Sequence, residues 1–213
     1  MEFIDKKLSN YCGAHTTPED QLLQKINRET HLEVLQPRML SGHLQGRFLS
    51  MLSKLKQPKR ILEIGTYTGY AALCMAEGLT LGGKLITLDI NEELAEKVRA
   101  YFAESQYAGQ LEMQVGDATK LIPVLDGPFD IVFIDADKEN YPLYFDLVIN
   151  KMAKGGLIIA DNVLWSGKVI ESVKENDTST KALLQYNAKI HNDPRVENIL
   201  LPIRDGLMMA VVV

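Results

Sequence analysis

The sequence predicts an α/β fold in which a mostly parallel, seven-stranded sheet carries helices on both faces. After Pro58, five short apolar runs of strand length alternate with four helical patterns. Two further strand-like segments close the chain, with Asp205-Gly206 between them. The length of 213 residues is enough for one sizeable core and short for two domains. We therefore expect a single domain.

The first sixty residues read as helices. Apolar side chains recur at roughly helical spacing over residues 18–35, a pattern that a proline then interrupts. A second amphipathic stretch follows at 44–55, for which Ser41 is a candidate N-cap. We expect residues 1–57 to form a helical cover over a Rossmann-like core of residues 58–213.

The core shows the rhythm of strand, helix and strand that is typical of a doubly wound sheet. Short runs that look buried on both faces, as parallel strands are, lie at 60–64, 84–89, 111–115, 129–135 and 156–161. Helical patterns lie between and after them at 70–81, 92–107, 119–125 and 141–152. This alternation predicts a parallel sheet with helices on both faces.

The end of the chain breaks that rhythm. Residues 196–203 and 207–213 are both strand-like, and Asp-Gly between apolar runs is among the strongest short-range signals for a hairpin. An ordinary dinucleotide-binding fold would add another strand–helix–strand unit here. A sheet that ends in an antiparallel hairpin is the arrangement of class I methyltransferases, although a fold alone does not specify a function.

Composition excludes several classes of protein. The apolar fraction is 46%, and no apolar run reaches the length of about 18 to 20 residues that spans a bilayer. Lys and Arg number 23 against 28 Asp and Glu, and this formal charge of −5 argues against a nucleic-acid coat or a binder of anionic membranes. The chain begins without the apolar segment of a secretory signal, and Cys12 and Cys74 are too few for a disulfide scaffold. We expect a cytoplasmic protein.

Ligands of open α/β sheets bind beyond the carboxyl ends of the strands. The first strand ends at Glu63, followed by Gly65 and Gly69. This G-x-x-x-G spacing lacks the G-x-G-x-x-G pattern that cradles a pyrophosphate, and Glu63 would suit a cofactor with a cationic amino group. The alternative is a glycine turn that serves packing alone.

The second strand ends at Asp89, where an acidic residue commonly accepts hydrogen bonds from ribose hydroxyls. Because NAD and S-adenosylmethionine (SAM) both carry a ribose, Asp89 indicates an adenosine site without naming the cofactor. Its alternative role is to cap the helix that follows. Gly116-Asp117-Ala118, after the third strand, would form a third wall of the same pocket.

The ends of the fourth and fifth strands carry the sharper signal. Asp135 follows one strand, and Asp161 and Asn162 follow the other. If these strands are neighbours, the three side chains form an all-oxygen site that suits Mg²⁺, Mn²⁺ or Ca²⁺ better than zinc. A cation beside Lys138 would disfavour its protonated form and make it a candidate base. The alternative is a set of helix caps and turn formers. Trp165 is either an aromatic wall for a flat substrate or a core or interface residue.

These motifs resemble the cation-dependent O-methyltransferase family, which contains the caffeoyl-CoA and catechol O-methyltransferases. The resemblance runs from about residue 37 to the C-terminus. It is carried by Met39-Leu40-Ser41, Glu63-Ile64-Gly65, Thr68-Gly69-Tyr70, Asp89-Ile90, Gly116-Asp117-Ala118, Phe133-Ile134-Asp135-Ala136-Asp137-Lys138 with Tyr141, Asp161-Asn162-Val163-Leu164-Trp165, Asp193-Pro194-Arg195 and Asp205-Gly206-Leu207.

The resemblance implies a role for each matching residue. It implies that SAM contacts Met39, Ser41, Glu63, Gly65, Thr66, Gly69, Tyr70, Ala71, Asp89, Ala118, Asp135 and Asp137. It implies a divalent cation, Mg²⁺ or else Mn²⁺ or Ca²⁺, held by Asp135, Asp161 and Asn162. Asp135 and Lys138 would be catalytic, and Trp165 and Ser166 would face the substrate. A homodimer is also implied.

Three departures from the family pattern leave the substrate open. Ala71 stands where the plant caffeoyl-CoA enzymes have Ser, and Ser166 stands where they have Asn. Residues 199–201 lack the carboxylate with which catechol methyltransferases grip their substrate. The expected function is SAM-dependent and cation-dependent O-methylation of a phenolic or catecholic hydroxyl on a small molecule.

Three alternatives to this function compete with it. The first is a tRNA hydroxyuridine O-methyltransferase, against which the acidic net charge counts. The second is a non-catalytic SAM-binding protein. The third is an NAD-dependent dehydrogenase, which the glycine spacing and the terminal hairpin disfavour.

Overall fold

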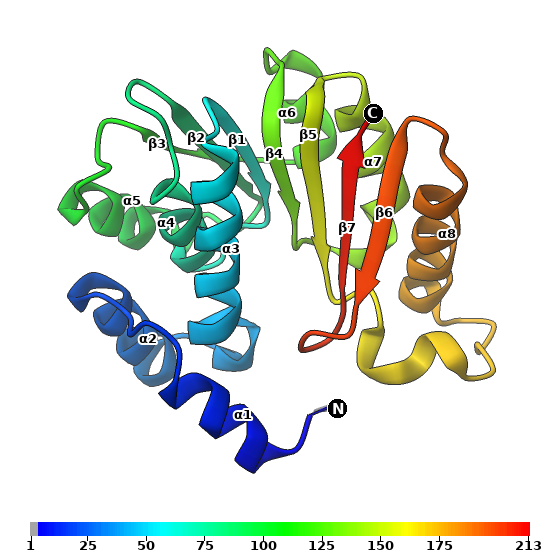
Figure 1. The fold of residues 1–213 in the computed structure, drawn as a ribbon, viewed down its shortest axis with the longest axis horizontal. Helices are drawn as coiled ribbons and strands as arrows, with labels where there is room; N and C mark the ends of the chain where they lie inside the picture. Colours follow the sequence, from blue (N-terminus) through cyan, green and yellow to red (C-terminus); the bar gives the residue numbers. More distant parts are fainter. Residues whose placement is uncertain (1–3) are drawn as a thin grey trace.

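A seven-stranded sheet organises residues 4–213, the part of the chain that the computed structural model describes (Figure 1). Its strands are β1 Arg60–Ile64, β2 Lys84–Asp89, β3 Leu111–Val115, β4 Phe129–Ile134, β5 Met152–Asp161, β6 Val196–Leu201 and β7 Leu207–Val212. The order is β3-β2-β1-β4-β5-β7-β6, in which β1 to β5 pair in parallel and β7 runs antiparallel to both β5 and β6. The predicted sheet and its terminal hairpin are therefore confirmed.

Helices pack on both faces of this sheet. The helices are α1 Lys6–Ala14, α2 Gln21–Glu33, α3 Gly42–Lys56, α4 Tyr70–Ala76, α5 Ala95–Glu104, α6 Ala118–Val124, α7 Tyr141–Ile149 and α8 Thr178–Asn192, with short 3-10 helices η1 Pro37–Met39, η2 Lys138–Asn140 and η3 Trp165–Ile170. Side chains of α2 to α5 share one buried cluster with Ile131 and Phe133, whereas those of α6 to α8 share the other with Val132 and Ile134. This alternation along β4 is the pattern of a strand buried on both faces.

The helices begin and end somewhat differently from the prediction. The helix predicted at 70–81 ends at Ala76, and Gly78 follows it in close contact with the backbone of Ser53. A side chain at Gly78 would collide with α3, so this glycine allows α3 and α4 to cross closely. The helix predicted at 92–107 is likewise shorter, spanning Ala95–Glu104.

Two features of the fold differ from what the sequence pattern predicted. Ser41 occupies the N-cap of α3 but makes no capping hydrogen bond, because its own backbone is already helical at φ −55° and ψ −39°. No helix was expected between η3 and the hairpin, where α8 forms. Its signals are the Asp177 side chain, which caps the helix at Thr180, and a buried stripe that includes Leu183 and Ile190.

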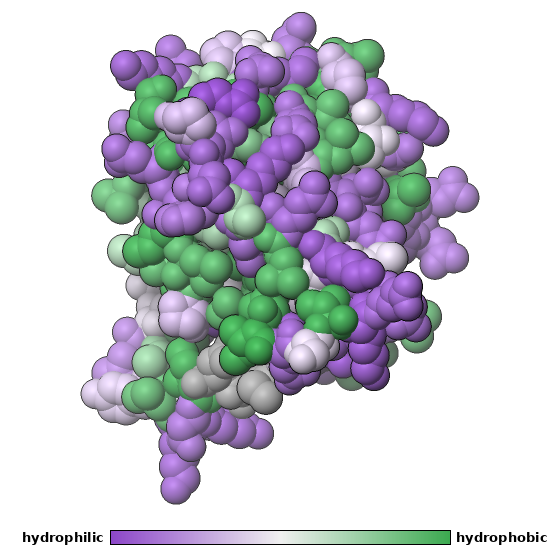
Figure 2. Space-filling model, turned by 90° about the vertical axis from the view of Figure 1, so that its right-hand side faces the viewer, coloured by the Kyte–Doolittle hydropathy of each residue, from purple (hydrophilic) through white to green (hydrophobic). Residues whose placement is uncertain are grey.

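The outer strands β7 and β6 are covered by α8 on one face, while Figure 1 shows no helix in front of the other. On the open face Ile199 is 54% exposed and Val211 43% exposed. Figure 2, which views the molecule from the right-hand side of Figure 1, shows apolar residues gathered on that side. The homodimer stays a prediction. Among the described residues, no helix combines the length and the apolar character that crossing a membrane requires.

Candidate functional site

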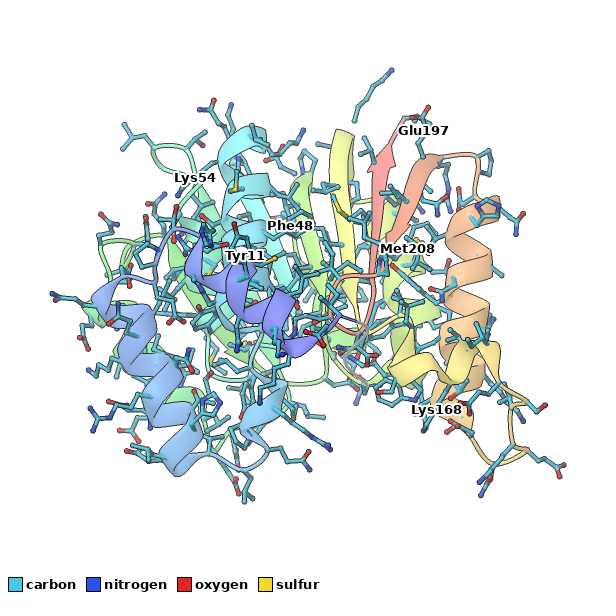
Figure 3. The ribbon with its side chains drawn as sticks, turned by 60° about the horizontal axis from the view of Figure 1, so that its bottom comes forward. Tyr11, Phe48, Lys54, Lys168, Glu197 and Met208 are labelled. Carbon is cyan, nitrogen blue, oxygen red and sulfur yellow. The ribbon has the colours of Figure 1, made fainter. Side chains whose placement is uncertain are left out.

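A cavity of about 1940 Å³ opens at the carboxyl ends of the parallel strands. Cavities that bind one small molecule usually measure about 300 to 1000 Å³, so this one has room for two ligands side by side. The predicted site residues line it, with the exceptions of Glu63 and Gly69. Residues of α1, which packs against α3, and Lys168 of η3 also line the cavity (Figure 3).

Asp89 and Gly65 fix the loop that follows β1. The Asp89 Oδ2 atom accepts hydrogen bonds from the backbone N–H groups of Thr66 at 2.9 Å and Tyr67 at 2.8 Å. Gly65 has φ +97°, and a Cβ atom there would lie 2.1 Å from the carbonyl oxygen of Asp135. Only glycine therefore allows the loops after β1 and β4 to approach so closely. Asp89 does not cap α5, which begins at Ala95, so that alternative is wrong.

Gly69 and Tyr70 form the start of α4 and have structural roles. Gly69 has φ +77°, and a Cβ atom there would lie 2.9 Å from the Phe102 ring. For Gly69, the structure therefore supports the packing role that the sequence left open as an alternative. Tyr70 is buried, and its hydroxyl donates to Glu19 at 2.5 Å, which ties α4 to the chain before α2. Ala71 lines the cavity next to it.

Four further residues that were predicted to bind the cofactor come from segments far apart in the chain. Met39 and Ser41 line the cavity from the junction of η1 and α3, and Ala118 does so from the first turn of α6. Asp137 precedes η2 and accepts a hydrogen bond from the Tyr144 hydroxyl at 2.5 Å. The fold thus brings these predicted cofactor residues to one cavity.

Glu63 is fully buried and does not line the cavity. The Thr87 hydroxyl donates to its Oε2 atom at 2.5 Å, whereas its Oε1 atom has no hydrogen-bond partner. The pKa of Glu63 is raised to about 8, mainly by burial, with a lowering effect from the Thr87 hydrogen bond and smaller raising effects from the charges of Asp135 and Asp89. A buried carboxylate of this kind is stabilised by a nearby positive charge.

We expect Glu63→Gln to remove a pH dependence of stability. The pKa of Glu63 is raised from 4.5 to about 8 in the folded protein, so between these values the folded state keeps a proton that the unfolded chain releases. Stability therefore falls as pH rises through this window. Urea unfolding should show that the wild type loses on the order of 2 to 4 kcal/mol between about pH 5 and about pH 9 relative to the variant.

The matched control for this measurement is Glu112→Gln on β3, because Glu112 is exposed. That variant should keep the pH dependence of the wild type. A Glu63→Gln protein whose unfolding free energy follows the wild type at every pH would contradict the raised pKa of Glu63.

Asp135, Asp161 and Asn162 meet where the neighbouring strands β4 and β5 end. Asp161 is 2% exposed; its Oδ2 atom accepts from Gln45 Nε2 and its Oδ1 atom from the backbone N–H of Asn162, each at 2.7 Å. The pKa of Asp161 is raised mainly by burial and to a smaller extent by the charge of Asp135. Within residues 4–213 no three His, Cys, Asp or Glu side chains gather as a metal site, and this corner has two carboxylates and an amide.

Lys138 is tethered at the same corner. Its Nζ atom donates to Asp135 Oδ1 at 3.0 Å and to the Tyr141 hydroxyl at 2.6 Å, and its side chain is 10% exposed. Tyr141 is fully buried, and its hydroxyl lies 3.0 Å from the carbonyl oxygen of Asp161. Burial raises the pKa of Tyr141 well above its ordinary value, so the phenol stays protonated. The sequence signal for this tether is the spacing of one helical turn between Lys138 and Tyr141.

Trp165 and Ser166 line the cavity from η3. With Gly167 they form three successive residues of positive φ, at 47°, 54° and 84°. Non-glycine residues adopt this conformation rarely, and such strain concentrates at functional sites. The backbone N–H of Ser166 donates to the Asp205 carboxylate, which holds the loop against the hairpin turn. Trp165 also packs against the core, which is one of its two predicted roles, and its role beside a substrate stays a prediction.

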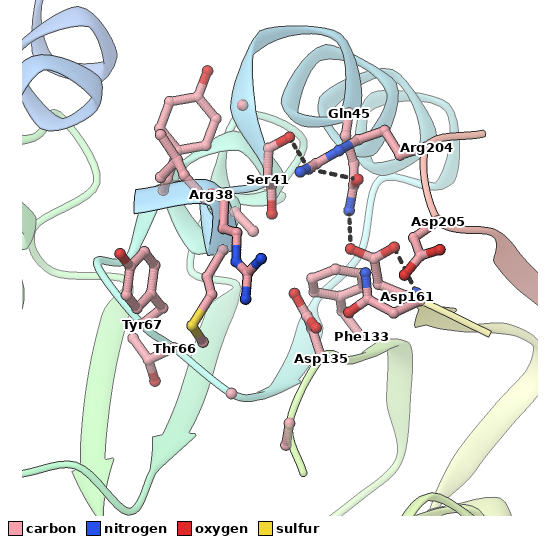
Figure 4. Close-up of a pocket in the computed structure, with 18 of the residues that line it drawn as sticks. Arg38, Ser41, Gln45, Thr66, Tyr67, Phe133, Asp135, Asp161, Arg204 and Asp205 are labelled. Carbon is pink, nitrogen blue, oxygen red and sulfur yellow. Dashed lines mark hydrogen bonds between the residues drawn. The ribbon is translucent and has the colours of Figure 1, made fainter. Parts of the chain in front are cut away.

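Among the cavity-lining side chains that were not predicted from the sequence, four are labelled in Figure 4. They are Arg38, Gln45, Tyr67 and Arg204. Gln45 had a signal, because it is a polar residue on the buried stripe of α3, one turn before Leu49. Nothing in the sequence pattern distinguished the other three.

The chain matches the O-methyltransferase family model over residues 13–213. This chain belongs to the O-methyltransferase family. Its similarity to the catechol O-methyltransferase of Niastella koreensis is 33% identity, covering 100% of this chain and 97% of the relative. Caffeoyl-CoA O-methyltransferase 5 of Nicotiana tabacum is 36% identical over 78% of this chain and 73% of the relative.

Solved structures share the fold of this O-methyltransferase. The crystal structure of the Bacillus cereus O-methyltransferase in complex with SAH has a TM-score of 0.89 and 31% identity, covering 97% of each chain. That of TomG from Streptomyces achromogenes, in complex with SAM, has a TM-score of 0.88 and 30% identity, covering 97% of this chain and 96% of the other. The predicted class I fold and enzyme class are therefore confirmed.

Proposed function

We propose that this O-methyltransferase transfers the methyl group of SAM to a phenolic or catecholic hydroxyl of a small molecule, with a divalent cation at Asp135, Asp161 and Asn162. The observation that carries the proposal is the corner where β4 and β5 end, because two carboxylates, an amide and Lys138 line one cavity with room for two ligands. We refer to Asp135, Asp161 and Asn162 at this place as the cation corner. The names of the catechol and caffeoyl-CoA relatives support the acceptor, and the SAH-bound and SAM-bound structures support the cofactor.

The residues present fit a cofactor that carries positive charge. The buried Oε1 atom of Glu63 has no hydrogen-bond partner, and the raised pKa of Glu63 shows that its ionised form is disfavoured. A cationic ligand nearby would stabilise that ionised carboxylate. We assign cofactor contacts to Met39, Ser41, Gly65, Thr66, Tyr70, Ala71, Asp89, Ala118, Asp135 and Asp137, with Glu63 and Gly69 supporting them from behind the β1 loop.

The residues also fit a divalent cation. Burial and, to a smaller extent, the charge of Asp135 raise the pKa of the Asp161 carboxyl group, and a cation at this corner would relieve the repulsion between the two carboxylates. The donor set contains only oxygen atoms, which suits Mg²⁺, Mn²⁺ or Ca²⁺. When bound, the cation would stabilise negative charge on the acceptor oxygen, and SAM would supply the methyl group.

Residues of the chain itself would orient the acceptor and receive or direct the proton of its hydroxyl group. We assign Lys138 Nζ to receive or steer the hydroxyl proton, since Asp135 and Tyr141 hold that atom at the cation corner. Trp165 and Ser166, which line the same cavity, would bound a flat ring. Much of the rate would come from holding the acceptor oxygen in line with the methyl group.

The test is a methyl-transfer screen with isotopically labelled SAM. Small catechols, hydroxycinnamoyl esters and tRNA are incubated with the enzyme in Mg²⁺ and in EDTA. We expect label on a phenolic acceptor in Mg²⁺, a loss of about a hundredfold or more in EDTA, and recovery when Mg²⁺ is restored. Labelling of tRNA alone would instead support the tRNA hypothesis. Equal turnover in EDTA would contradict the cation.

A further inference from the structure

A chain of hydrogen bonds runs from the C-terminal hairpin turn to the cation corner (Figure 4). Arg204, in the turn between β6 and β7, donates through Nη1 to Gln45 Oε1 at 3.0 Å and to the carbonyl oxygen of Ser41. Gln45, fully buried on α3, donates through Nε2 to Asp161 Oδ2 at 2.7 Å. We refer to Arg204, Gln45 and Asp161 as the hairpin relay.

The chemistry of the hairpin relay fixes the direction of each hydrogen bond. A guanidinium has only donors, so Gln45 must present its carbonyl oxygen to Arg204 and its NH₂ group to Asp161. The second oxygen of Asp161 accepts from the backbone N–H of Asn162. The carboxylate is therefore held at both oxygens, and rotating it would break two hydrogen bonds inside a buried site.

Arg204 is positioned to serve this relay. Across residues 4–213 it forms no ion pair, so its interactions on the cavity side are those with Gln45 and Ser41. Its backbone has φ 51°, a conformation that a residue with a side chain adopts rarely. The turn thus presents an arginine to α3 at some cost in backbone strain.

We propose that Gln45 and Arg204 are positioning residues that hold the Asp161 carboxylate ready for the divalent cation. This inference rests on the cation site of the proposed function. Gln45 acts through Asp161, as hydrogen bonds to metal ligands do in other proteins, where their loss weakens metal affinity by about 10-fold to 100-fold. Through Ser41, the same arginine contacts the segment before α3 that is proposed to bind the cofactor.

The test is the Gln45→Met variant, which keeps the length of the side chain and removes both hydrogen bonds. Titration calorimetry on the full-length protein measures Mn²⁺ binding with SAH at saturation, and SAM binding separately. We expect the Mn²⁺ dissociation constant to rise about tenfold or more, with less than a threefold change for SAM. Excess Mg²⁺ should restore kcat, which a general folding defect would not allow.

The matched control is Gln110→Met. The Gln110 amide donates to the carbonyl oxygens of Thr80 and Gly83, each at 3.0 Å, and Gln110 does not line the cavity. This variant should bind Mn²⁺ as the wild type does and should show the thermal destabilisation that losing a hydrogen-bonded glutamine amide causes by itself.

A double-mutant cycle separates the relay from two independent effects. Arg204→Met should weaken Mn²⁺ binding by itself, and the Gln45→Met/Arg204→Met protein should be little weaker than Gln45→Met, because both changes break one relay. Wild-type Mn²⁺ affinity in a folded Gln45→Met protein would overturn this inference alone. Absence of Mn²⁺ binding in the wild type would overturn it together with the proposed cation site.

Discussion

The Asp161→Asn variant is expected to lose about a thousandfold in cation-dependent methyl transfer while folding and binding SAM as the wild type does. Asparagine has nearly the same shape, and its single oxygen atom can accept one of the two hydrogen bonds that Gln45 and the Asn162 backbone donate to the carboxylate. What it removes is one of the two carboxylates at the cation corner. Because each factor of ten in rate corresponds to about 1.4 kcal/mol, such a loss equals roughly 4 kcal/mol of transition-state stabilisation.

The same substitution should change the stability of the fold little. Burial and the charge of Asp135 raise the pKa of Asp161, so at neutral pH the ionised carboxylate lowers the stability of the folded protein. In EDTA, urea unfolding of Asp161→Asn should give a free energy within about 1 kcal/mol of that of the wild type, because the loss of one hydrogen bond offsets the removal of the buried charge. Asp146→Asn, at an exposed carboxylate on α7, is the control and should keep full activity. Full activity of Asp161→Asn in EDTA would refute the cation corner.

The Lys138→Met variant is expected to lower kcat by about a hundredfold to a thousandfold with little effect on the dissociation constant of SAM. Lys138 is the amine that Asp135 and Tyr141 hold at this corner of the cavity. Methionine keeps the length of the side chain and cannot accept or donate the proton. Measured from acid to alkaline pH, the variant should also lose the part of the kcat profile that proton transfer to the lysine produces.

The control for this change is Lys189→Met on α8. Lys189 also pairs with an aspartate, Asp146, but lies outside the cavity, so its loss should leave kcat unchanged. Unchanged kcat across the pH range in Lys138→Met would remove Lys138 from the reaction. A fall in SAM affinity that matches the fall in kcat would instead make it a binding residue.

Much of the fold could be predicted because it depends on local pattern. Strands buried on both faces read as continuous apolar runs, and Asp205-Gly206 marks the hairpin. The carboxyl ends of parallel strands share one edge, so the sequence predicted that Asp135 and Asp161 would meet if their strands were neighbours, and the structure shows that β4 and β5 do pair. The helix α8 was not predicted, although its cap and buried stripe are also local signals.

The sequence by itself determined which residues stand at the strand ends, and with them the class of enzyme. Only the tertiary structure decided how those residues are supported. Gln45 and Asp161 are 116 positions apart, and Gln45 and Arg204 are 159 apart. Likewise, the unpartnered Glu63 oxygen depends on packing from several elements at once. Such contacts are made by chain segments that meet only when the sheet and its covering helices assemble, so no periodicity or spacing encodes them.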